Sequence, residues 1–145
     1  DYVDGLKGGV KGLRLAWSPT LGRDVPVDPE IAALTRAAAL AFRDLGATVE
    51  EVDPGFEDPI ETLMTIWSAG AALALRTAGP AERARMDPGL VAVAEQGERV
   101  PGAAYVDALL NQRNTLAHRM AQFHARFDLL LTPTLPLPAF EAGAN

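Results

Sequence analysis

The chain has 145 residues, a formal charge of −6, a pI near 4.8 and no cysteine. This length suits one domain with its own core, and the missing cysteines exclude disulfides and thiolate metal sites. The acidic balance disfavours a nucleic-acid or anionic-membrane surface, and no apolar run approaches the roughly 20 residues that span a bilayer. We therefore expect a soluble protein of the cytoplasm, without nucleic-acid or membrane partners. The opening residues lack an initiator Met, which hints at a longer protein.

The first half of the chain predicts a strand–helix–strand unit. After a glycine-rich lead-in, Leu13–Trp17 alternates in the manner of a strand. Asp28 and Pro29 then begin a helix whose apolar positions recur at helical spacing as far as Leu45. Gly46 stands where a left-handed residue ends a helix, and a second strand follows at Thr48–Val52. Such a unit predicts parallel strands joined by a right-handed crossover.

Three helices are predicted in the middle of the chain. The first runs from Asp58 and Pro59 to about Thr77, with small residues at 69–72 that allow another backbone to approach. A short helix follows Asp87, and the longest spans Ala103 to Arg126. Arg113 falls on the apolar stripe of that last helix, which predicts a buried guanidinium with polar partners. A structural position at a helix–helix seam and a ligand-facing position both remain open.

The segment Phe127–Pro138 predicts the centre of the sheet. Three consecutive leucines without alternation indicate a strand buried on both faces. Pro133 lacks the N–H that a ladder needs, so the strand should stop at Thr132 and leave through a stiff proline-rich exit. The predicted fold class is therefore α/β: one segment over residues 1–145, with a βαβ unit followed by helices and a central buried strand.

No catalytic, cofactor or metal site is predicted from the residues themselves. His118 and His124 lack partners at zinc-ligand spacing, and His118 should be solvated while His124 packs at the core. Neither Ser18 nor Ser68 lies in a nucleophile elbow. The glycines of the lead-in precede a strand, whereas a phosphate-binding loop follows one.

Four segments, in the same order and at similar separations, resemble the part of amidase-signature hydrolases that follows their catalytic core. They are Gly9–Ala16, Val27–Glu30, Leu45–Val52 and Phe127–Thr134. The resemblance implies a fragment of the amidase-signature fold, part of an enzyme that hydrolyses carbon–nitrogen bonds of small amides. It also implies that a catalytic serine, a second serine and a lysine lie upstream of residue 1, so the chain alone should be inactive.

The same family includes the glutamine-hydrolysing subunit of glutamyl-tRNA(Gln) amidotransferases. In those members an arginine before a glycine binds the substrate carboxylate. The matching stretch here, Val91–Gly97, has no positive charge, and its Glu95 would repel a carboxylate. This departure favours a neutral or apolar amide as substrate.

Two residues are predicted to contact that substrate. Thr134 follows the last strand, at the edge where open α/β sheets bind ligands. Trp67 lies on the helix whose family counterpart approaches the acyl pocket. Each has a structural alternative, because Trp67 could be core and the Thr134 hydroxyl could satisfy a turn.

Two other functions compete with this one. A stand-alone, non-catalytic α/β binding module is the main alternative, and a Rossmann-type enzyme is disfavoured by the position of the glycines. If the chain comes from a larger sheet, its open strand edges should also favour homo-oligomers.

Overall fold

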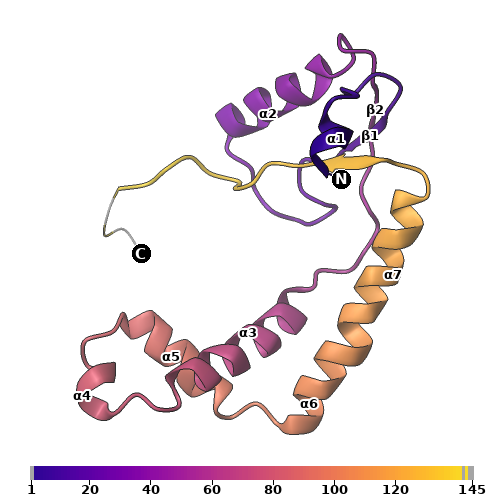
Figure 1. The fold of residues 1–145 in the computed structure, drawn as a ribbon. Helices are drawn as coiled ribbons and strands as arrows, with labels where there is room; N and C mark the ends of the chain where they lie inside the picture. Colours follow the sequence, from indigo (N-terminus) through magenta and orange to yellow (C-terminus); the bar gives the residue numbers. More distant parts are fainter. Residues whose placement is uncertain (1, 142, 144–145) are drawn as a thin grey trace. The chain divides into compact units, whose positions relative to one another are not determined.

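The computed structural model describes residues 2–141 and 143, and its contacts gather in two compact units. One, here called the α/β unit, contains the residues up to Phe56 and those from Arg119 onward. The other, here called the helical unit, is Glu57–His118. The helical unit is therefore an insertion in the α/β unit, which takes its residues from both the first and the last part of the chain (Figure 1).

The α/β unit is built on a small parallel sheet. Its elements are α1 (Tyr2–Leu6), β1 (Arg14–Trp17), α2 (Pro29–Ala41), β2 (Thr48–Glu51) and β3 (Leu129–Leu131). The strand order is β2-β1-β3, and Leu15 of β1 lies opposite Val49 on one side and Leu129 on the other. The expected α/β class and the parallel βαβ unit are therefore confirmed.

Strand β1 holds the central position, and it is covered on both faces. Leu15 and Trp17 pack with Ala39 of α2, while Ala16 packs on the other face with Phe123 of α7 (Arg113–His124). The sequence predicts β3 at the centre of the sheet. In the three-stranded sheet described, β3 is instead an edge strand, and Leu129 is 45% exposed. The predicted end of β3 ahead of Pro133 is confirmed.

The ends of α2 follow from the chemistry of two residues. Asp28 Oδ1 accepts the N–H groups of Glu30 and Ile31, at 2.9 and 3.4 Å, as an N-cap does. Gly46 has a φ of +88°, in the left-handed region that the sequence predicted. The helix ends at Ala41 and the chain then turns, so Leu45 leaves the predicted apolar face and is exposed.

The helical unit contains α3 (Ile60–Leu75), α4 (Pro80–Arg83), α5 (Pro88–Gly97), α6 (Gly102–Asp107) and the π-helical turn η1 (Ala108–Gln112). Helices α3 and α5 lie side by side (Figure 1). A Cβ built on Gly97 would lie 1.8 Å from the carbonyl oxygen of Ser68, so only glycine permits this approach. The close backbone contact predicted for the small residues of α3 thus occurs at Ser68 and Ala69.

The prediction that Arg113 is buried is wrong, because its side chain is exposed. The physical reason is that the stripe crosses from one unit to the other. Arg113 lies in the helical unit, whereas Phe123 and Phe127, which share its predicted stripe, lie in the α/β unit and are buried in the core there.

Candidate functional site

The three parallel strands end at one edge of the sheet, and the residues after them meet there. Ser18 follows β1 and is fully buried. Its Oγ donates to Asp53 Oδ1 at 2.6 Å and accepts the N–H of Leu21 at 2.9 Å. Its own N–H donates to the Leu131 carbonyl at 3.0 Å. Ser18 therefore ties together the exits of all three strands.

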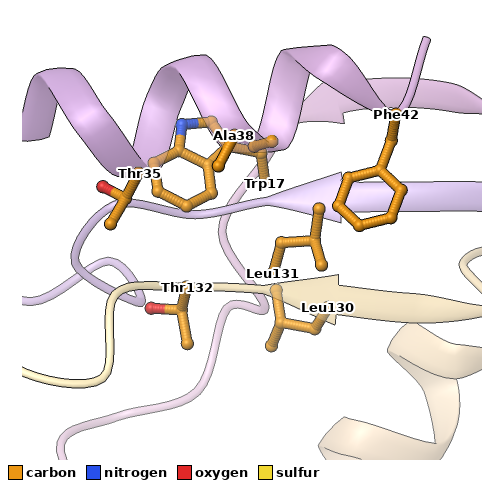
Figure 2. A pocket seen from close by; sticks show the side chains of 8 residues that line it. Trp17, Thr35, Ala38, Phe42, Leu130, Leu131 and Thr132 are labelled. Carbon is orange, nitrogen blue, oxygen red and sulfur yellow. The ribbon is translucent and has the colours of Figure 1, made fainter. Parts of the chain in front are cut away.

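A pocket of about 290 Å³ opens between α2 and the β1–β3 pair. Figure 2 shows Trp17, with Thr35 and Phe42 from the helix side, facing Leu131 and Thr132. The hydroxyl of Thr35 is occupied, because it donates to the Ile31 carbonyl at 2.6 Å. The lining carries no ionisable side chain. It can hold an apolar group, and it supplies no general base.

Thr134 lies on the stiff segment beyond this pocket, two residues after Thr132, and its side chain is exposed. The segment is anchored at Pro136, whose carbonyl accepts the N–H of Asp28 at 2.7 Å. Because Asp28 also caps α2, one residue fixes both the helix start and the strand exit. Thr134 is thus held at the sheet edge with its hydroxyl in the open.

Trp67 belongs to the helical unit and is 60% exposed, which argues against the core interpretation. Ile60 and Leu63 share its side of α3, at helical spacings of seven and four residues, and are 44% and 54% exposed. We call Ile60, Leu63 and Trp67 the open face of α3. From Thr62 to Leu75 the helix carries no charged residue, so this face can contact only apolar or neutral groups well.

The amino edge of the sheet carries a charged contact that sequence reasoning missed. Asp128 accepts the backbone N–H of Arg14 at 2.7 Å and its guanidinium nitrogens Nε and Nη2 at 3.3 and 3.1 Å. These bonds lower the pKa of Asp128, and the same carboxylate raises the pKa of Arg14. Only the charges of the two residues hinted at this, since 114 positions separate them.

The two serines and two histidines have structural surroundings in their own units. Ser68 is buried, and its Oγ makes only a long 3.4 Å bond to the Thr65 carbonyl. His118 is exposed, as expected. His124 packs edge-on to Phe123 at 5.5 Å, and its Nδ1 lies 3.1 Å from the Phe127 carbonyl. Within residues 2–141, no three potential ligands gather to hold a metal ion.

Among the helices described, none is long and apolar enough to cross a membrane. Two of the surfaces described above suit an apolar ligand. They are the pocket between α2 and the β1–β3 pair, and the open face of α3.

Known proteins are similar in sequence to this chain over 96% or more of its length. It is 35% identical to an acylamidase of Rhodococcus erythropolis, covering 96% of this chain and 29% of that protein. It is 32% identical to an amidase of Pseudomonas putida, covering 98% of this chain and 30% of that protein. A glutamyl-tRNA(Gln) amidotransferase subunit of Synechococcus is 34% identical, with 100% and 34% covered. The chain thus spans about a third or less of these relatives.

Solved structures share the fold. A bacterial aryl acylamidase of the amidase-signature enzymes superposes with a TM-score of 0.75 at 26% identity, covering 100% of this chain and 32% of that one. A 6-aminohexanoate cyclic dimer hydrolase, solved with its substrate, superposes with a TM-score of 0.79 at 24% identity, covering 98% of this chain and 31% of that one. At this identity the match shows a shared fold only. The family profile described as Amidase matches residues 1–145. The chain belongs to the amidase family.

Proposed function

We propose that this chain is part of an amidase that hydrolyses carbon–nitrogen bonds, in which it supplies sheet and substrate-pocket wall. The nucleophilic serine, its partner serine and the lysine would come from residues outside 1–145. The observation that carries the proposal is the family match over all 145 residues, in relatives about three times as long. In the reaction, the serine adds to the amide carbonyl, the amine leaves with a proton, and water then hydrolyses the acyl-enzyme.

Trp67 and Thr134 are our candidates for substrate contact. Trp67 offers an exposed aromatic ring on an uncharged helix face, which suits an apolar acyl or aryl group. Thr134 offers an exposed hydroxyl at the sheet edge, which can bond an amide oxygen or nitrogen. Both positions support the assignment, because a residue closed into a core could not reach a ligand.

The substrate we propose is a small neutral or apolar amide. Glu95 is exposed on α5, and the stretch Val91–Gly97 around it has no basic residue that could pair with a substrate carboxylate. A carboxylate-bearing substrate such as glutamine would meet repulsion there instead. We place the reaction in the cytoplasm and propose no nucleic-acid partner, in keeping with the acidic composition.

The experiment compares two proteins made from the same gene. One is the 145-residue chain, and the other extends it by the residues encoded upstream of Asp1. We expect the longer protein to hydrolyse an uncharged aryl amide and the shorter one to release no product. Turnover by the short chain that is lost in Ser18→Ala or Ser68→Ala would contradict the proposal. So would an initiator Met immediately upstream with no further reading frame, which would favour the binding-module alternative.

A further inference from the structure

The π-helical turn η1 is held by a chain of side-chain bonds that reaches α3. Gln112 Nε2 donates to Asp107 Oδ2 at 2.7 Å, and Asn111 Nδ2 donates to the other oxygen, Oδ1, at the same distance. The Gln112 carbonyl oxygen in turn accepts the hydroxyl of Thr62 at 2.6 Å. One amide group is therefore bonded at both ends, to the start of η1 and to a neighbouring helix. π-Helical turns are rare and often mark functional sites.

Helix α3 has three distinct sides in the helical unit. Gly97 of α5 touches the backbone at Ser68, η1 is bonded at Thr62, and the open face carries Leu63 and Trp67. At roughly 100° per residue, these three directions divide the circumference of the helix into about thirds. The two contacted sides therefore leave one third of the helix, and the open face occupies it.

We propose that Gln112 is a positioning residue that sets the rotation of α3 and thereby presents the open face. Helix α3 packs along α5, with its closest approach at Gly97, and a helix packed on one side only can still roll about that contact. A second contact on a different side stops that roll, and the Thr62–Gln112 bond supplies it. Because the open face includes Trp67, the role of Gln112 in substrate selection rests on the function proposed above.

The Asp107 carboxylate keeps the Gln112 amide in the required orientation. It accepts a hydrogen bond from Gln112 Nε2, so the side-chain oxygen of Gln112 faces Thr62. The bonds from Asn111 and Gln112 lower the pKa of Asp107, because they favour its charged form. A charged acceptor makes the stronger hydrogen bond.

The absence of cysteine from the sequence allows a direct test of helix rotation. Single cysteines replace Leu63, on the open face, or Ile66, which is half-buried on the side nearer η1. The ratio of their reaction rates with a thiol reagent reports which side of α3 faces the solvent. We expect Thr62→Val and Gln112→Ala to lower this ratio by roughly threefold or more, since thiol reactivity follows exposure. Thr62→Ser, which keeps the hydroxyl, should keep the ratio at its wild-type value.

The matched control is Thr65→Val, on the same helix. The Thr65 hydroxyl donates to the Glu61 carbonyl within α3, so its loss should leave the ratio unchanged. Circular dichroism identifies any variant that has lost its helices. If Gln112→Ala does not fold, Gln112→Glu takes its place, because the new carboxylate is repelled by Asp107. A folded Thr62→Val chain with an unaltered ratio overturns the proposal. Because no amide hydrolysis is measured, this outcome is independent of whether the longer protein is an amidase.

Discussion

Arg14 and Asp128 join the first and last strands of the sheet through both backbone and side chain. The Asp128 N–H donates to the Arg14 carbonyl at 2.8 Å, and the Arg14 N–H donates back to the Asp128 carboxylate at 2.7 Å. The carboxylate thus takes the place of a backbone acceptor at the amino end of the β1–β3 pair. This contact fixes the register in which Leu15 lies opposite Leu129.

We predict that Asp128→Asn destabilises the chain at pH 7 and that its deficit relative to wild type shrinks in acid. The pKa of Asp128 is lowered in the folded state, so its contribution is present above the unfolded pKa of about 3.9. That contribution is lost as the pH falls through the lower, folded pKa. Urea unfolding at several pH values between 7 and 2 measures it. Asp4→Asn, in the exposed Lys7–Asp4 pair, should change little at any pH.

Gly97→Ala should destabilise the helical unit by about 3 kcal/mol or more, because the new Cβ would overlap the Ser68 carbonyl and force α3 and α5 apart. Gly70→Ala is the matched control, since a Cβ there meets nothing within 4 Å. Replacing glycine by alanine in an open helical position should stabilise by roughly 0.5–1 kcal/mol. Equal effects of the two substitutions in urea unfolding would refute the close contact.

Truncation of the two tryptophans should change stability by very different amounts. Trp17 is 3% exposed in the sheet core, so Trp17→Ala should cost about 3–5 kcal/mol. Trp67→Ala should change stability by less than about 1 kcal/mol, because most of its ring is already in water. In the longer protein, Trp67→Ala should instead alter the ratio of kcat/KM between bulky and small amides. Early melting with an unmoved ratio would mean that Trp67 packs against protein.

Ser18→Ala should lower stability by roughly 1–3 kcal/mol, because it leaves the partly buried N–H of Leu21 without its acceptor. Leu21 has a φ of 60° and depends on that bond to hold a left-handed conformation. Ser68→Ala removes only a long bond and should cost less. A larger loss in the Ser68 variant would be inconsistent with these contacts.

Self-association is expected through the open edges of the sheet. In the described part of the chain, β2 and β3 each pair on one side only. Light scattering at roughly tens of micromolar should therefore show species larger than a monomer. A monomer under these conditions would contradict this expectation.

The local signals of the sequence predicted the features that local chemistry determines. Asp28 and Asp87 cap their helices as expected, because a carboxylate and the next few N–H groups suffice. The register contact of Arg14 with Asp128 and the approach of Gly97 to Ser68 depend on distant partners, which no local pattern encodes. The error at Arg113 has the same origin, since the predicted stripe extends across two units of the fold, and helical spacing alone does not show where one unit ends. Trp67 was predicted from a family resemblance and Thr134 from its position after the last strand, and the roles of both remain predictions.

The separation between β1 and β3 also determines the order in which the protein can fold during synthesis. The partners Arg14 and Asp128 are 114 residues apart, which a ribosome translates in about ten seconds. Of these two neighbours, only β2 is available to pair with β1 during that interval, and β3 is not yet made. Residues 57–118 leave the ribosome in the same interval and make their contacts among themselves. The helical unit can therefore form on the nascent chain before the sheet is complete.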